Sequence, residues 1–206
     1  MITVPSGSAV PVMITVLVLA GFLLLNEFAA RRWRPPAEVS RKVAHVGSAL
    51  LAAGSCLWLD HRWYVIIGIG FTVALLAARR FLPLRSLSSR SDRSWGEVLF
   101  GLGVAVAALI ADRAASFVLA VLILGLADTA AHLIGRRVPV RPLIVGRTVG
   151  GSTTFLIIAV LVALPAGPGP AAVVGLGCAL AELVSPRGTD NLTVPAVAAA
   201  VLTALA

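Results

Sequence analysis

The sequence has 206 residues, of which 59% are hydrophobic and only 13% are charged, and its mean hydropathy is +0.98. A soluble domain carries about 25% charged residues, so this composition excludes an ordinary soluble protein. The net charge of +8 does not indicate nucleic-acid binding, because the basic residues lie in short loops between apolar runs, where they fit the positive-inside pattern of membrane proteins.

Apolar segments follow one another along the whole chain. A transmembrane helix needs roughly 20 mainly apolar residues. The expected helices lie at 9–28, 42–59, 63–81, 97–112, 115–135, 151–166, 170–185 and 192–206. Because several of the last five runs are short, seven spans are an alternative to eight. We predict an all-α, polytopic membrane helix bundle of about 7–8 transmembrane helices, which forms a single catalytic domain over residues 1–206.

Basic residues gather in alternate loops. The loops after the first, third, fifth and seventh segments hold most of the 17 Lys and Arg residues, whereas the other loops are very short. Positively charged loops stay in the cytoplasm, so both termini are expected outside. The loop at 81–95 is either an amphipathic segment on the membrane surface or a plain connector. The richness in Arg and Ala suggests a bacterial source, and we expect an integral protein of the bacterial cytoplasmic membrane.

Ionisable residues lie near the expected cytoplasmic ends of the helices. Such residues are expensive within a membrane and therefore mark function by default. Arg41 shares a helical face with His45, and Asp128 shares one with His132, because both pairs are four residues apart. His132 is alternatively a helix-packing residue. Glu97 is either part of the site or an acid that complements a helix dipole. Together these groups predict a site for metal and phosphate.

The segment GRTVGGSTT (146–154) enters the sixth expected helix. Gly150 and Gly151 allow close approach of the backbone to a ligand. Ser152 can cap the helix, whose N-terminus favours phosphate. Arg147 adds charge-assisted hydrogen bonds. The alternative interpretation of this segment is helix packing and capping.

The segment ELVSPRGTDNLTVP (182–195) joins the last two expected helices. Pro186 and Gly188 end one helix, and Asp190 either caps the next or belongs to a binding site. In the second interpretation, Glu182, Asp190 and Asn191 bind a metal or a nucleotide ribose. Oxygen ligands without cysteine suit magnesium.

Four motifs carry a resemblance to a known family. RKVAHVG (41–47), ADTAAHLIGRR (127–137), GRTVGGS (146–152) and ELVSPRGTDNLTVP (182–195) occur in this order. The set resembles the CTP-dependent lipid-alcohol kinases, which include phytol kinase, dolichol kinase and fungal-type diacylglycerol kinase. These kinases are distantly similar to CDP-diacylglycerol synthases, whose C-terminal signature is missing here. The resemblance covers about residues 38–200. Arg147 stands where that family usually has Lys, and an Arg fork is not equivalent to a point charge.

The resemblance implies a membrane-embedded kinase that transfers a phosphoryl group from a nucleoside triphosphate to the hydroxyl of a lipid alcohol. CTP is the expected donor, Mg²⁺ or another divalent cation the expected cofactor, and phytol, another prenol or polyprenol, or diacylglycerol the acceptor. The expected partners are these substrates and membrane lipids, without nucleic acid. The alternatives are a cytidylyltransferase that makes a CDP-lipid and a small-molecule membrane transporter.

The predicted residues fall into four groups, with the role of each inferred from the chemistry and the resemblance together. They are the catalytic Asp128, His45 and Lys42; the nucleotide- or phosphate-binding Arg41, Gly135, Arg147, Thr148, Gly150, Gly151, Ser152 and Asn191; the metal ligands Asp128, Glu182 and Asp190; and the additional candidates Glu97 and His132.

Overall fold

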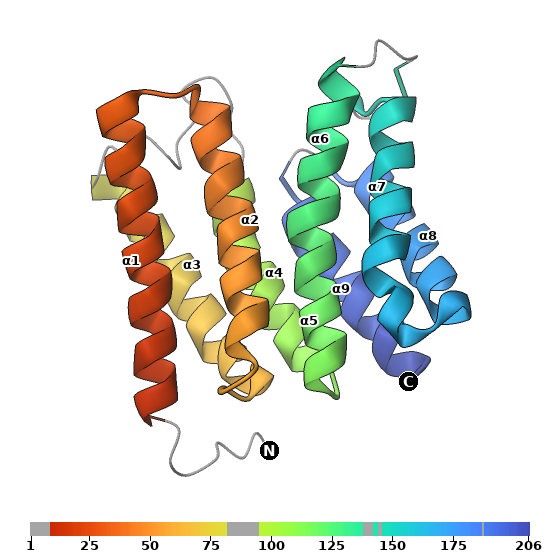
Figure 1. Cartoon of the computed structure of the whole chain (residues 1–206), viewed down its shortest axis with the longest axis horizontal. Helices are drawn as coiled ribbons and strands as arrows, with labels where there is room; N and C mark the ends of the chain where they lie inside the picture. Colours follow the sequence, from red (N-terminus) through yellow and green to blue (C-terminus); the bar gives the residue numbers. More distant parts are fainter. Residues whose placement is uncertain (1–8, 82–94, 138–141, 144–145, 187) are drawn as a thin grey trace.

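The computed structural model describes residues 9–81, 95–137, 142–143, 146–186 and 188–206, and the described part of the chain is helical without a β-strand (Figure 1). The helices, in chain order, are α1 (Ala9–Trp33), α2 (Ala37–Ser55), α3 (Tyr64–Phe81), α4 (Gly96–Ile110), α5 (Ala114–Leu122), α6 (Asp128–Arg137), α7 (Val149–Ala163), α8 (Pro168–Val184) and α9 (Asp190–Ala204). A π-helical segment, Ile123–Ala127, joins α5 to α6 without a break.

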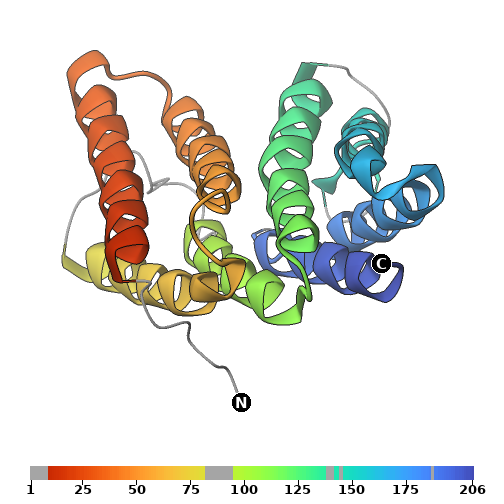
Figure 2. The ribbon, with the colours of Figure 1, turned by 60° about the horizontal axis from the view of Figure 1, so that its bottom comes forward.

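The helices form two layers. Figure 2 shows α1, α2, α5–α6 and α7 above a layer that contains α3, α4 and α9. The continuous helix Ala114–Arg137 is central, because α5 and the π-segment contact α2, α4, α7 and α9. The expected segment at 115–135 is therefore confirmed as one helix.

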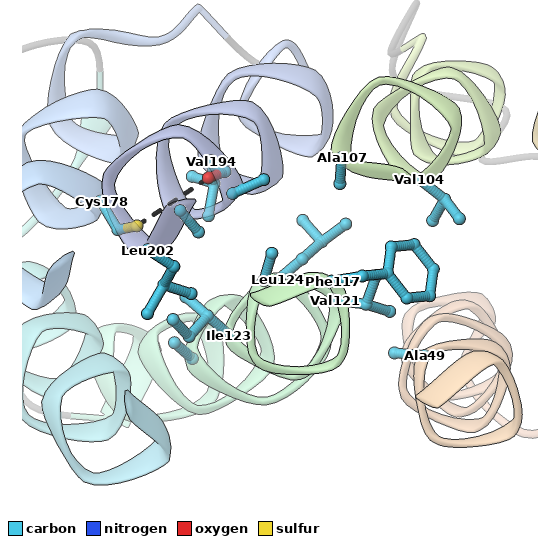
Figure 3. Packing of buried hydrophobic residues seen from close by; sticks show 14 of the residues in the cluster. Ala49, Val104, Ala107, Phe117, Val121, Ile123, Leu124, Cys178, Val194 and Leu202 are labelled. Atoms are coloured by element: carbon cyan, nitrogen blue, oxygen red, sulfur yellow. Dashed lines mark hydrogen bonds between the residues drawn. The ribbon is translucent and has the colours of Figure 1, made fainter. Parts of the chain in front are cut away.

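The core surrounds this central helix. Phe117, Val121, Ile123 and Leu124 are fully buried. Figure 3 shows these side chains between the helices that carry Val104 and Ala107, Val194 and Leu202, and Ala49. Burying apolar side chains of this size stabilises a fold by about 1.5–3 kcal/mol each when the alternative is water, although the gain is smaller when the alternative is lipid. The core therefore depends on close packing rather than on hydrophobic transfer alone.

Small residues allow that close packing. A side chain at Gly103 of α4 would overlap the backbone carbonyl of Asn191 in α9. A Cβ atom at Gly125 in the π-segment would lie 2.5 Å from the Cβ of Ala49 in α2. Glycine at these positions lets the helix backbones approach each other, as is typical of helices packed within a membrane.

Four helices are long and apolar enough to cross a membrane: Ala9–Trp33, His61–Phe81, Ala114–Arg137 and Val149–Ala166. Three further apolar helices are shorter, and the expected number of seven to eight spans is thus not established by helix length. The helices α4 and α9 have 15 residues each, which corresponds to about 22 Å. This is less than the hydrocarbon thickness of about 30 Å.

Candidate active site

A single cavity of about 440 Å³ gathers nearly all of the predicted site residues. It lies at the end of the bundle where α2, α7 and α9 begin and α6 ends (Figure 1). The predicted residues that line it are Arg41, Lys42, His45, Glu97, Asp128, His132, Gly135, Arg147, Thr148, Gly151, Ser152, Glu182, Asp190 and Asn191. Among the described residues, Gly150 is the predicted one that does not line this cavity. The carbonyl of Gly150 instead accepts a hydrogen bond from Thr154 within α7.

Lys42 and Asp128 form an ion pair in the lining of the cavity. Nζ of Lys42 donates to Oδ2 of Asp128 at 2.5 Å, although the two residues are 86 positions apart in the sequence. Both side chains are about 85% shielded from solvent. Asp128 directly follows the π-segment and is the first of the ten residues of α6, so it lies in the last turns of the continuous helix, as expected. Such π-segments occur frequently at functional sites.

His45 lies beside this pair. Its Nε2 is 3.2 Å from the backbone carbonyl of Leu124 and 3.7 Å from Oδ2 of Asp128. The Leu124 carbonyl is an acceptor within hydrogen-bond distance, so Nε2 carries a hydrogen and donates it to this carbonyl. This atom therefore cannot accept a proton from a substrate, and His45 is better suited to orienting Asp128. His45 was expected to open its helix, but α2 begins eight residues earlier, at Ala37.

Glu38 connects the cavity side of α2 to α6. Both of its carboxylate oxygens accept from Nη2 of Arg41, at 2.7 and 2.8 Å. Nε2 of His132 approaches Oε1 of Glu38 to 3.0 Å. The direction of the ring N–H does not make this approach a hydrogen bond, so it counts as an ion pair only when His132 is protonated.

Arg147 bridges two carboxylates from different helices. Its Nη2 donates to Asp190 at 2.6 Å, and its Nη1 lies 3.0 Å from Glu182. Partial burial alone would lower the pKa of Arg147, but the hydrogen bond and charge of Asp190, with the charge of Glu182, outweigh it and raise this pKa. Arg147 therefore stays cationic and holds the starts of α7 and α9 near the end of α8.

The start of α7 is capped by a residue other than the expected one. The hydroxyl of Thr148 accepts from the backbone N–H of Gly151 at 3.1 Å, so Thr148 is the N-cap. Ser152 instead donates to Glu182 at 3.5 Å. A Cβ at Gly135 would lie 2.9 Å from the Thr148 hydroxyl and 3.3 Å from Cα of Gly151. Gly135 and Gly151 thus allow α6 and α7 to approach closely, which supports the packing interpretation of this segment.

The remaining predicted residues lie in the first turns of α4 and α9. The side-chain amide of Asn191 donates to the carbonyl of Gly96 at 2.8 Å. Glu97 lies in the first turn of α4, and its Oε2 is 4.0 Å from Nη1 of Arg79. Asp190 lies in the first turn of α9, and Thr189 holds the N-cap position, so the interpretation of Asp190 as the cap was wrong.

The three predicted metal ligands do not form a ready metal centre. Asp128 is paired with Lys42, and Glu182 and Asp190 are paired with Arg147. Within the described part of the chain, no three His, Cys, Asp or Glu side chains are grouped so that they could hold a metal ion. Carboxylates are the correct donors for magnesium, but here basic side chains neutralise them.

Several residues in or beside the cavity escaped the sequence analysis. Glu38 carries a detectable signal, because an acid three residues before Arg41 on a helix predicts an ion pair. Leu23, Phe71, Leu75 and Phe100 line the cavity itself. No local signal distinguishes these apolar side chains from those that face lipid.

The chain is similar to the uncharacterized protein MJ1137 of Methanocaldococcus jannaschii. The two are 26% identical over 176 residues, which cover 80% of this chain and 92% of that protein. No protein-family model matches the chain. No solved structure matches it either. Since the relative is uncharacterized, it supplies no activity, and the functional inference depends on the residues of the cavity.

Proposed function

We propose that the protein transfers the terminal phosphoryl group of a nucleoside triphosphate, with CTP as the preferred donor, to the hydroxyl of a lipid alcohol in the membrane. The observation that carries this proposal is the single cavity that joins three components. These are the Lys42–Asp128 pair, the cation Arg147 at the start of α7, and an apolar wall. The four sequence motifs that resemble lipid-alcohol kinases supply most of its polar lining.

The start of α7 is the proposed phosphate site. Backbone N–H groups at a helix N-terminus favour anions, and Arg147 stands directly before this one. The guanidinium of Arg147 is paired with Asp190 and Glu182, so a bound triphosphate would compete with these two carboxylates for the guanidinium. The two carboxylates released in this exchange are oxygen ligands of the kind that a magnesium ion bound to the triphosphate prefers. In this proposal the metal enters as part of the nucleotide substrate.

Asp128 is the proposed acceptor of the substrate proton. The lipid hydroxyl oxygen attacks the terminal phosphorus, and the bond from that phosphorus to the bridging oxygen breaks. The nucleoside diphosphate leaves, and the hydroxyl proton passes to the Asp128 carboxylate late in the transfer. Lys42, at 2.5 Å from Asp128, is placed to neutralise charge on the transferred group. His45, fixed by its hydrogen bond to the Leu124 carbonyl, packs beside Asp128 at 3.7 Å and limits the positions that this carboxylate can take.

The proposed orientation of the protein in the membrane has this cavity on the cytoplasmic side. Among the described residues, basic side chains lie in the last turns of α1, α3 and α6, which end on the same side of the bundle as the cavity, and this supports that orientation. The number of spans proposed is eight, with the short helices α4 and α9 tilted little or ending in the interface. A lipid alcohol would then meet cytoplasmic nucleotide at headgroup depth.

A nucleotide-by-lipid panel tests this proposal. Purified protein receives labelled CTP or ATP with magnesium and, in separate reactions, phytol, geranylgeraniol, a polyprenol or diacylglycerol. We expect a phosphorylated lipid and a nucleoside diphosphate in equal amounts, with CTP preferred. If no lipid is phosphorylated with either nucleotide, the kinase proposal is wrong. Pyrophosphate release would indicate a CDP-lipid synthase, and solute flux into liposomes without phosphorylation would indicate a transporter.

A further inference from the structure

The cavity has an apolar side that the phosphoryl-transfer chemistry does not use. Leu23 of α1, Ala44 of α2, Phe71 and Leu75 of α3, and Phe100 of α4 line it, and all five belong to the first four helices. The lining residues from α6 to α9 are mainly polar or glycine, and the first four helices also contribute the polar Arg41, Lys42, His45, Ser48 and Glu97. The cavity therefore has both a polar and an apolar lining, and its large apolar side chains all come from α1, α3 and α4.

The arrangement of the first four helices leaves room for this side. The α3 helix packs against α4, with Gly68 and Gly101 at the contact, while α1 packs against α2. Among the described residues, few of those in the α3–α4 pair lie close to residues of the α1–α2 pair. Phe71 and Leu75 lie one turn apart on α3 and share a face that lines the cavity between the pairs. Leu75 is only 7% exposed, whereas the next residue, Leu76, is 42% exposed.

An aromatic contact joins the apolar side to the proposed reaction centre. The rings of Phe100 and His45 are 4.9 Å apart between centroids and are tilted at 59°. His45 also lies 3.7 Å from Asp128. A molecule with its hydroxyl at Asp128 would therefore have its next carbon atoms beside Phe100, with α3 beyond.

We propose that Leu23, Phe71, Leu75 and Phe100 bind the part of the lipid alcohol nearest its hydroxyl and thereby set the specificity for the acceptor. This inference rests on the proposed function. The whole cavity is about 440 Å³, near the lower end of the range of about 300–1,000 Å³ for small-molecule sites, and nucleotide phosphates must share it. A long chain cannot fit inside, so its distal part must leave between the helices into the bilayer. The protein consequently selects the structure near the hydroxyl rather than the total chain length.

Photolabelling tests the binding site without requiring turnover. The probes are two long-chain alcohols, one with a diazirine near the hydroxyl and one with a diazirine at the far end, applied to the full chain in lipid nanodiscs. We expect the first probe to label peptides that contain Phe71–Leu75 or Phe100, and unlabelled alcohol to compete better than its methyl ether. The far-end probe should label lipid-exposed positions. Labelling by the first probe only outside these peptides would overturn the inference.

A matched pair of variants tests the same wall through kinetics. In Leu75→Trp a larger side chain fills the apolar side of the cavity. In Leu76→Trp the same larger side chain stands at the neighbouring, exposed position. We expect Leu75→Trp to raise the KM for the lipid by about tenfold or more, with the KM for the nucleotide unchanged, since small changes in an apolar pocket shift specificity by about 10- to 200-fold. Leu76→Trp should leave both values unchanged. Equal lipid KM values for the two variants would overturn the inference.

The acceptor panel separates this inference from the proposed function. Alcohols that differ only far from the hydroxyl should react with similar kcat/KM, whereas a change of branching next to the hydroxyl should alter kcat/KM by about tenfold. A strong dependence on total length would contradict the inference and leave the kinase proposal intact. Wild-type protein that phosphorylates no alcohol would refute the proposed function, and the photolabelled peptides would still decide where an alcohol binds.

Discussion

The two ends of the helix bundle both carry ionisable residues, but they use them differently. At the end opposite the cavity, the described acid–base contacts join neighbours in the sequence: Asp112 with Arg113, and Asp60 with His61, which form an ion pair only when His61 is protonated. At the cavity end, Glu38 and Arg41 also form a local pair, but Lys42 reaches Asp128 across 86 positions, and Arg147 reaches Asp190 across 43. Local pairs serve turns between helices, whereas distant pairs bring several helices around one site.

Exposure sharpens this contrast. The side chains of Asp112 and Arg113 are 41% and 56% exposed, whereas those of Lys42 and Asp128 are 15% and 14% exposed. Exposed pairs contribute little to stability. Buried pairs cost a large desolvation energy that their attraction need not repay, so they are weak evidence for a purely stabilising role. The difference is consistent with the role proposed for the charges at the cavity end.

The largest effect is expected from Asp128→Asn. Asparagine keeps the size of the side chain but cannot take up the substrate proton, so phosphorylation of the lipid should fall by at least about a hundredfold. The measurement is the rate of labelled lipid formation. Because Lys42 then lacks its partner, the double variant Lys42→Gln/Asp128→Asn should recover thermal stability without activity. Wild-type turnover in either variant would contradict the role of Asp128.

A smaller effect is expected from changes at Arg147. Charge-assisted hydrogen bonds contribute about 1.5–3 kcal/mol, so Arg147→Gln should raise the KM for the nucleotide by roughly tenfold or more. Arg147→Lys keeps the positive charge but loses the planar guanidinium with its paired N–H donors, so it should raise the KM for the nucleotide less. The raised pKa of Arg147 keeps it cationic, so it should cause no step in nucleotide KM as pH changes. An unchanged KM in Arg147→Gln would remove this residue from the phosphate site.

The contact between α6 and α7 offers a test through stability. Gly135→Ala places a Cβ 2.9 Å from the Thr148 hydroxyl, and overpacking of this kind costs about 1–3 kcal/mol. Gly70→Ala is the matched control, because nothing lies within 4 Å of its added Cβ. The unfolding temperature in detergent should fall for the first variant only. A similar change in both variants would contradict the close approach of these helices.

The smallest effect is expected at the opposite end. Asp112→Asn removes one exposed ion pair with Arg113 and should change lipid phosphorylation by less than about twofold. The same assay as for Asp128→Asn measures it, so the two substitutions compare the two ends directly. A loss of activity at Asp112 that matched the loss at Asp128 would remove the contrast between the ends.

The helices could be predicted from the sequence because their signals are local. The segment expected at 115–135 is the helix Ala114–Arg137. The helix α8 ends at Val184, and Pro186 and Gly188 follow it, as expected, with Gly188 at a φ of 89°. The position of the polar residues at one end also followed from hydropathy. The segment at 81–95 lies almost wholly outside the described residues, so its amphipathic interpretation stays a prediction.

The pairings inside the cavity could not be predicted in the same way. Nothing near Lys42 in the sequence indicates that it meets Asp128, because that contact depends on how α2 packs against the central helix. The carboxylates expected to share a metal turned out to be paired with bases. Leu75 and Leu76 are chemically identical, and only the three-dimensional structure separates the side chain that lines the cavity from the one that is exposed.

The fate of two labels in one nucleotide tests the central claim most directly. CTP labelled at both its first and its terminal phosphorus is incubated with the wild-type protein, magnesium and phytol in nanodiscs. We predict that the terminal label appears in the lipid and the first label in CDP, in equal amounts, and that Asp128→Asn abolishes both while Asp112→Asn retains both. The first label in the lipid, or no label in any lipid alcohol of the panel, would contradict the proposal.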